Sequence, residues 1–350
     1  MAGRRKWGGR LRWHTGGTAV RRRAEGVSGA SYSGLPAGPR KATRDIDAEV
    51  ESLNPVIVQT EDQIEALRRA CAWLGVRRGR ASRYQRLLEE SLDGACEEEH
   101  LLAAFESSEI VDLYVLWERH AAEFPGVKDR LRRVAAKGAT LREGERPASS
   151  GNRPRNDAFV LLLAGKLLAA DIDIVGVDGI MRSGVNCRES ADIVLCVKSE
   201  PFAVECKRLQ SWNRLEERFR EASRQFRRRS LPGMVAVDCS VLLRPPGTLL
   251  ESRNLALAGV RVSELLEHRV APRLYRHFTP DEPDLLGTVL FARIPAMTQL
   301  DLGVGRFRRD RTSSWLMMKN RYAEEENSMA MDEIGRKWGN AAQQSGVQQL

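Results

Sequence analysis

The chain has 350 residues, of which 42% are hydrophobic and 29% charged, a composition typical of a soluble globular protein with a full core. Its longest apolar stretch, residues 158–170, is interrupted by Lys166 and is too short to cross a bilayer, so no membrane span is expected. The N-terminus is basic but lacks the apolar run of an export signal, and we expect a cytoplasmic protein.

The net charge of +9 is concentrated at the N-terminus. Residues 1–44 contain eleven Lys or Arg and one acid, a net charge of +10 that leaves −1 for residues 45–350. This segment is rich in Gly, Ser and Arg and poor in apolar residues, so we expect a disordered basic leader. Such a leader can bind polyanions without specificity, can be a plain tail, or can be translated from upstream of the true start; the sequence leaves all three open.

Residues 45–145 are predicted to form several short amphipathic helices. Thr60 and Gln63 make a capping box ahead of apolar residues at helical spacing, and residues 110–117 repeat that spacing. No residue pattern in this helical region indicates a catalytic site. The polar stretch 142–154 carries Pro and Gly and is predicted to be a linker.

The composition changes after this linker. Asn156 or Asp157 is expected to cap a helix that runs to about residue 170. The elements expected next are strands at 172–177, 192–197 and 201–206, a charged helix at 212–229, a strand at 234–241, a helix at 263–274 and a strand at 288–294. Residues 323–350, rich in Gln, Asn and Glu, are expected to be a loose tail. This order indicates an α/β fold with a mixed central sheet flanked by helices, preceded by a small all-helical region.

The segment 203–208, with the sequence AVECKR, contains residue types that suit a catalytic site. Side chains alternate faces along a strand, so Glu205 and Lys207 share one side of an otherwise apolar strand. A hairpin through the turn at 198–201 would bring Asp192 close to Glu205. Mg²⁺ and Mn²⁺ take oxygen ligands and keep several waters, so one Asp, one Glu and a backbone carbonyl make a sufficient open site. Lys207 would orient a water or offset charge that develops on a phosphate.

Asp192 followed by Glu205-x-Lys207, in a strand–turn–strand context with a charged helix and a further strand behind it, resembles the PD-(D/E)XK nuclease-like superfamily. The resemblance covers about residues 150–300. It implies a restriction-endonuclease-like core that hydrolyses phosphodiester bonds with Mg²⁺ or Mn²⁺. The implied partner is nucleic acid, with DNA the expected substrate.

The resemblance also implies roles for individual residues. Asp192 and Glu205 would hold the metal together with the backbone carbonyl of Cys206. Lys207 would be the catalytic lysine, and Gln225 would face the site from the charged helix.

One position departs from the family. Many members carry a Glu on the helix before the first strand, where this chain has Val160. Asp157 lies one helical turn earlier and is a further candidate metal ligand, although it is also a candidate helix cap. Two readings therefore stay open, an active nuclease and a catalytically inactive scaffold that binds nucleic acid or a protein partner.

The helix at 212–229 carries seven arginines against three glutamates. Its basic end would contact a phosphate backbone, or the helix is a solvated surface with internal ion pairs. The chain has no P-loop, no GxSxG elbow and no HExxH motif, and its six cysteines form no CxxC pair. ATP hydrolysis by a P-loop, acyl transfer and zinc proteolysis are therefore not expected.

Overall fold

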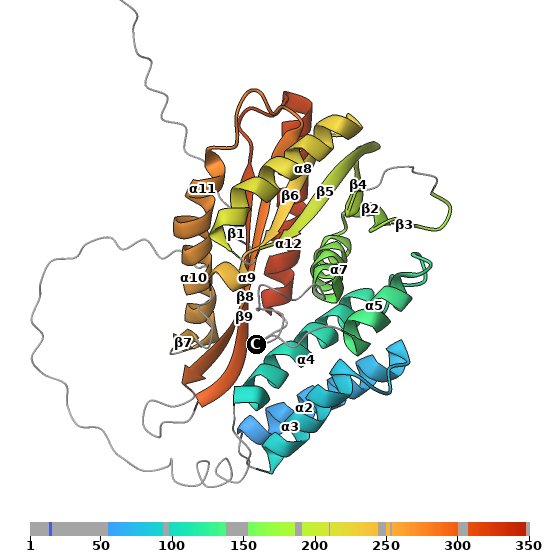
Figure 1. Cartoon of the computed structure of the whole chain (residues 1–350), viewed down its shortest axis with the longest axis vertical. Helices are drawn as coiled ribbons and strands as arrows, with labels where there is room; N and C mark the ends of the chain where they lie inside the picture. Colours follow the sequence, from blue (N-terminus) through green and yellow to red (C-terminus); the bar gives the residue numbers. More distant parts are fainter. Residues whose placement is uncertain are drawn as a thin grey trace, which may run out of the picture.

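The computed structural model describes His14–Thr15 and residues 55–93, 98–137, 153–185, 191–209, 211–243, 250–252, 254–299 and 307–347. Apart from that dipeptide, the expected basic leader lies outside the described residues, as does most of the expected linker. The described strands form one mixed sheet with helices on both of its faces (Figure 1). The expected α/β class is thereby confirmed. No helix in the described ranges has the length and apolarity that a membrane crossing requires.

The N-terminal helices pack against the sheet domain. They are α2 (Pro55–Leu74), α3 (Arg80–Leu92), α4 (Glu98–Trp117) and α5 (Val127–Ala136). The indole N–H of Trp117, at the end of α4, donates to the carbonyl oxygen of Leu161 in α7 (Arg153–Ala169) at 2.9 Å. Gly165 lets the two helices approach, because a Cβ there would meet Leu116 at 2.8 Å. One hydrophobic core accordingly runs from Ile64 in α2 across one face of the sheet.

The sheet contains nine strands within the described residues, in the order β1-β9-β8-β6-β5-β4-β2-β3, with β7 beside β8. Strand β5 is parallel to β6, β6 to β8 and β7 to β8, while the other pairs are antiparallel. The strands are β1 (His14–Thr15), β2 (Asp173–Val177), β3 (Ile180–Met181), β4 (Ile193–Val197), β5 (Glu200–Arg208), β6 (Gly233–Asp238), β7 (Leu250–Ser252), β8 (Leu285–Gln299) and β9 (Phe307–Lys319).

Strands β4 and β5 form the hairpin that the sequence predicts. Val197 pairs with Glu200, so Lys198 and Ser199 form a two-residue turn. Both turn residues have positive φ, 51° and 71°, as a type I′ turn requires. Ile193 pairs with Val204, which fixes the register along the hairpin.

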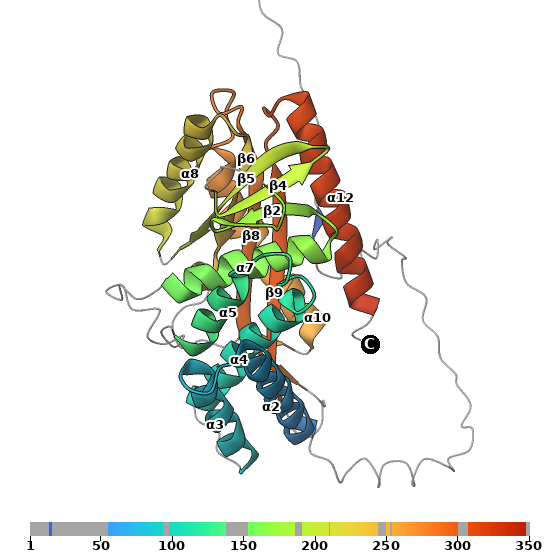
Figure 2. The same ribbon diagram turned by 90° about the vertical axis from the view of Figure 1, so that its right-hand side faces the viewer.

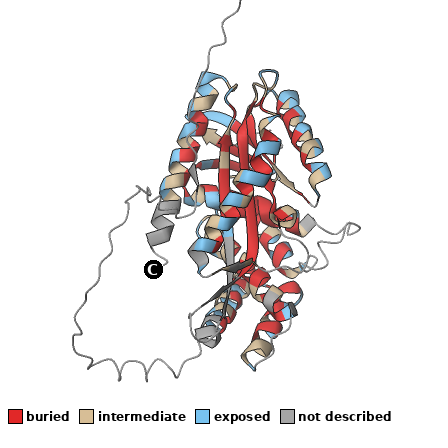
Figure 3. Cartoon of the chain, turned by 90° about the vertical axis from the view of Figure 1, so that its left-hand side faces the viewer, coloured by how far each residue is buried: buried red, intermediate tan, exposed pale blue. Residues whose placement is uncertain are grey.

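The two faces of the sheet carry separate apolar cores. Val204 belongs to the core on the side of α7, whereas Ala203 belongs to the core that includes Phe219 and Phe226 of α8 (Leu215–Arg229). Figure 2 shows α8 and α12 on opposite sides of the sheet, and Figure 3 shows the buried strands between them. The remaining helical elements are η1 (Trp212–Arg214), α9 (Ser240–Leu243), α10 (Leu255–Leu265), η2 (Leu266–Val270), α11 (Ala271–Tyr275) and α12 (Glu325–Val347).

Two segments differ from the expectation. Residues 323–350 were expected to be loose, but α12 occupies most of them because Met331, Ile334 and Trp338 form a buried stripe at helical spacing. The helix after the linker begins at Arg153. Asn156 and Asp157 therefore lie within its first turns and do not cap it.

Candidate active site

The hairpin register places the predicted carboxylates on one face of the sheet. Asp192 immediately precedes β4, and because Ile193 faces Val204 in β5, Asp192 comes opposite Glu205. Residues directly opposite each other in an antiparallel pair project to the same face. That face also carries Ala203 and is the one covered by α8.

Asp192 is fixed by the neighbouring strand. Its Oδ2 accepts a hydrogen bond from the backbone N–H of Cys206 at 2.7 Å. Burial raises the pKa of Asp192 above its ordinary value, and the negative charge of Glu205 raises it further. The hydrogen bond from Cys206 acts in the opposite direction. Asp192 is thus close enough to Glu205 for the charge of Glu205 to disfavour ionisation of Asp192.

Glu205 lies at the centre of the cluster, with 3% of its side chain exposed. A buried carboxylate requires partners, and both of its oxygens have a cationic one. Lys207 Nζ donates to Oε2 at 2.9 Å, and Arg229 Nη1 donates to Oε1. The cluster thus contains two acidic residues, Asp192 and Glu205, and two basic residues, Lys207 and Arg229, so its formal charges balance.

Helix α8 supplies the other wall of the site. Gln225 Oε1 accepts from Lys207 Nζ at 3.3 Å, so the structure brings Gln225 to the lysine. Arg229 was missed in the sequence analysis, where it was counted only among the arginines of the charged helix. Its spacing of four residues from Gln225, which puts both side chains on one helix face, is the signal that could have found it.

Asp157 and Val160 lie elsewhere. Val160 is buried in the core on the α7 side of the sheet, the side away from Glu205. Asp157 Oδ1 lies 3.6 Å from Arg130 Nη1, and Arg130 also pairs with Asp178. The structure therefore engages Asp157 with Arg130 of α5 and does not bring it to the Asp192–Glu205 pair.

The donor set can be tested against a hard divalent cation. Asp192 and Glu205 offer carboxylate oxygens on one face, and Cys206 offers its backbone carbonyl between Glu205 and Lys207 in the sequence, all of them ligands of the type that Mg²⁺ prefers. Within the described part of the chain there is no group of three or more His, Cys, Asp or Glu side chains that could hold a metal ion. Two carboxylates and one carbonyl would suit only a cation that keeps several waters, and Arg229 would have to leave the Glu205 oxygen to which it donates.

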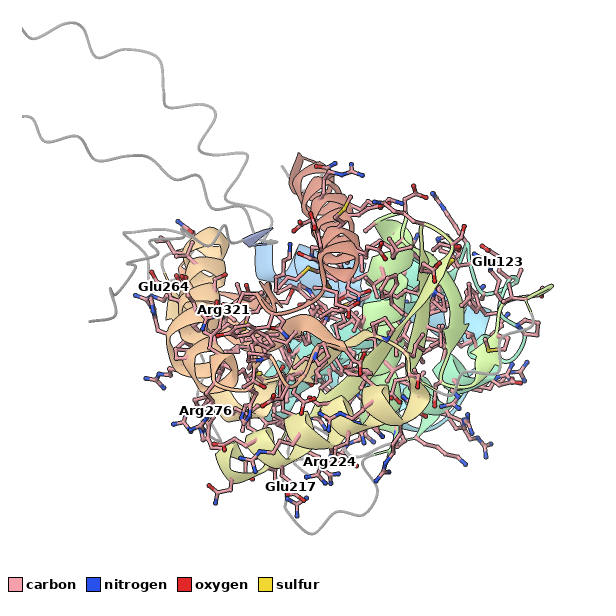
Figure 4. All side chains as sticks on the ribbon, turned by 90° about the horizontal axis from the view of Figure 1, so that it is seen from above. Glu123, Glu217, Arg224, Glu264, Arg276 and Arg321 are labelled. Atoms are coloured by element: carbon pink, nitrogen blue, oxygen red, sulfur yellow. The ribbon has the colours of Figure 1, made fainter. Side chains whose placement is uncertain are left out.

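The outer surface of α8 is largely paired. Arg218 contacts Glu221 at 2.6 Å, and Arg220 contacts Glu216 at 3.4 Å. Arg224 is exposed, and Figure 4 shows it on the outward side of α8, as it does Glu217. The internal ion pairs expected for a solvated helix surface are present, and exposed arginines remain beside them.

The chain matches no protein-family model, no curated protein and no solved structure. The nuclease-like resemblance therefore rests on the residues themselves.

Proposed function

We propose that this protein is a metal-dependent phosphodiester hydrolase that acts on nucleic acid, with DNA as the expected substrate. The observation that carries the proposal is the convergence of Asp192, Glu205 and Lys207 on one face of the β4–β5 hairpin, with Gln225 of α8 bonded to the lysine. Two neighbouring carboxylates whose charges oppose each other are a common arrangement for holding a divalent cation.

Each side chain has a role in this reading. Asp192 and Glu205, with the Cys206 carbonyl, would hold Mg²⁺ or Mn²⁺. When bound, the cation would polarise the scissile phosphate and lower the pKa of a coordinated water. Lys207 is positioned by Glu205 Oε2 and Gln225 Oε1, and its third N–H is left to donate to a water or a phosphate oxygen.

Arg229 adds a donor that the family resemblance did not supply. Its guanidinium matches the geometry of a phosphate group, and it reaches the site from the last turn of α8. An incoming phosphate would offer Arg229 a new partner and so release Glu205. In this reading Arg229 stabilises the empty site and contacts the substrate in the occupied one.

The pairing of Glu205 with two cations also favours the second candidate, an inactive scaffold that binds nucleic acid. Lys207 and Arg229 neutralise the Glu205 carboxylate without any metal. In addition, α7 carries Val160 at the position where many members of the family carry a glutamate. The same face would then bind phosphate through its basic side chains alone.

Cleavage assays separate the two candidates. Supercoiled, linear and single-stranded DNA, and RNA, are incubated with Mg²⁺ or Mn²⁺ and with wild type, Glu205→Gln or Lys207→Ala. Glu205 would hold the cation and Lys207 would donate to the phosphate, and loss of one group that stabilises charge in the transition state reduces the rate by about 10²–10³-fold. We expect losses of that order in both variants.

Two exposed residues of the same hairpin provide matched controls. Glu200→Gln and Lys198→Ala remove a carboxylate and an ammonium from the turn region and should leave cleavage unchanged. Cleavage of no substrate by a folded wild-type protein that still binds DNA would refute the hydrolase and support the scaffold. Activity that survives Lys207→Ala would refute the assigned site.

A further inference from the structure

A second polar cluster lies on the opposite face of the sheet from Glu205, at the carboxyl ends of the parallel strands. Arg208 ends β5, Asp238 ends β6, and Arg293 lies in β8 two residues beyond the partner of Asp238. These side chains line a cavity of about 40 Å³, together with Arg155 of α7. In open α/β sheets, ligands bind in the crevice outside the carboxyl ends of the strands.

The cavity wall contains hydrogen-bond donors that have no acceptor. Arg208 donates through Nε to Asp238 Oδ2 at 3.2 Å, but its Nη1 has no hydrogen-bond acceptor in the described structure. Arg293 contacts Asp112 through Nη2, whereas its Nε has no acceptor there. Its Nη1 lies 3.9 Å from Glu109 Oε2, too far for a hydrogen bond. Both side chains are 6% exposed, so water at the surface does not satisfy these donors. Buried donors without acceptors are rare because each lost hydrogen bond is costly.

Donors without acceptors, and not a net charge, favour an anion here. Arg155 pairs with Glu106, Arg208 with Asp238, and Arg293 with Asp112. Arg80 pairs with both Glu106 and Glu109, so four arginines stand against four carboxylates around the cavity. Burial lowers the pKa of Arg208 despite its pairing with Asp238, and the neighbouring charge of Arg155 adds to this lowering. One added negative charge would relieve this repulsion.

The remaining wall is apolar. It includes Phe159 and Phe291, whose rings stack with centroids 5.8 Å apart. Electrostatic attraction is stronger in such surroundings than in water. The volume is about three times the space that one water needs, which suits the head of an oxyanion and excludes a base or a sugar.

We propose that this cavity binds a small oxyanion, a phosphate or carboxylate group, through the guanidinium groups of Arg208 and Arg293. Guanidinium forks bind the oxygens of both groups in a bidentate manner. The proposal does not rest on the hydrolase function, because the cavity and the Asp192–Glu205 pair lie on different faces of the sheet.

Thermal unfolding of the full chain tests the proposal. Inorganic phosphate, sulfate or acetate is titrated at constant ionic strength maintained with NaCl, so that general screening by salt does not change. We expect a saturable rise of the unfolding midpoint with at least one oxyanion. Comparison of phosphate and sulfate with acetate distinguishes a tetrahedral from a planar ligand.

Arg208→Lys is the informative variant because it keeps the positive charge beside Asp238 but removes the fork. It should weaken binding by about tenfold, the loss expected for one charge-assisted hydrogen bond. Arg224→Lys, on the exposed side of α8, is the matched control and should bind like wild type. Equal affinity in Arg208→Lys and wild type would refute the assignment.

A measurement on the wild-type protein covers the case in which the variant does not fold. Nuclear magnetic resonance of the arginine side-chain Nε–H groups observes buried and exposed arginines alike. Saturating phosphate or acetate should shift the Nε–H resonances of Arg208 and Arg293 but not that of Arg224. If no oxyanion stabilises the protein more than chloride and these resonances do not move, water alone fills the cavity and the proposal is wrong.

Discussion

Replacing Lys207 and Arg229 together by Met should destabilise the protein by more than the sum of the two single replacements. Each cation contacts a different oxygen of Glu205, whose side chain is 3% exposed. After one replacement the other cation still pairs with the carboxylate. After both, a buried negative charge is left without these partners.

The structure sets the expected magnitudes. The side chains of Lys207 and Arg229 are 16% and 19% exposed, so water replaces part of each interaction, and we expect each single replacement to cost about 1 kcal/mol. A buried charge left without its partners costs about 3–5 kcal/mol, so the double replacement should cost about 4 kcal/mol. The coupling energy, which is this cost minus the two single costs, should be about 2 kcal/mol. Adding Glu205→Gln to the double variant should recover part of the loss, because a neutral amide is less costly to bury.

Urea unfolding, followed by the fluorescence of the chain's seven tryptophans, measures these free energies. The comparison requires a single transition in every variant. Replacement of Arg218 and Arg220, exposed arginines of the same helix with partners of their own, should be additive and cost under about 1 kcal/mol each. Additivity of Lys207→Met and Arg229→Met within about 0.5 kcal/mol would refute the shared-carboxylate argument.

Three further predictions follow from other contacts. Arg229→Met frees a carboxylate oxygen, so Mg²⁺ or Mn²⁺ should raise the thermal midpoint of this variant more than that of wild type; an equal rise would contradict competition between arginine and metal. Burial opposes ionisation of Glu109, but Arg80 and other arginines outweigh it and hold its pKa below the ordinary 4.5. The unfolded chain then binds more protons, so stability is present above that ordinary pKa and is lost as pH falls through the folded value. Urea unfolding of Glu109→Gln should show a smaller loss of stability than wild type between about pH 5 and about pH 3, and parallel curves would contradict this. In Gly233→Ala the added Cβ would approach the carbonyl oxygen of Ala203 to well under 3.0 Å, and the resulting shift should cost at least about 1–3 kcal/mol in the same assay. Wild-type stability in this variant would mean that the two strands can separate at little cost.

The sequence predicted the central hairpin and the residues that it brings together. Alternation along β5 put Glu205 and Lys207 on one face, and the short turn after β4 put Asp192 beside them. These predictions succeeded because strand periodicity and a two-residue turn fix register locally. The position of Gln225 next to Lys207 also agrees with the structure.

The elements that the sequence analysis missed depend on distant contacts. Strand β9 begins with FRRDRTSS, which shows no apolar alternation, and it is held by its ladder with β8. Helix α12 is mostly polar, so composition hid the stripe that contains Ile334 and Trp338. The cavity at Arg208 and Arg293 could not be predicted from the sequence, because it joins residues from α4, α7 and three parallel strands.

The shared core of the N-terminal helices and the sheet limits how the protein can be shortened. Helix α4 contacts α7 through Trp117, and Asp112 pairs with Arg293 of β8. A fragment that begins after residue 152 would present the apolar side of α7 to water and leave Arg293 without that carboxylate. Newly exposed apolar surface of this kind promotes aggregation. The boundary near residue 150, although it follows the change in composition, therefore marks a poor place to cut, and soluble expression of the sheet should require the helices that precede it.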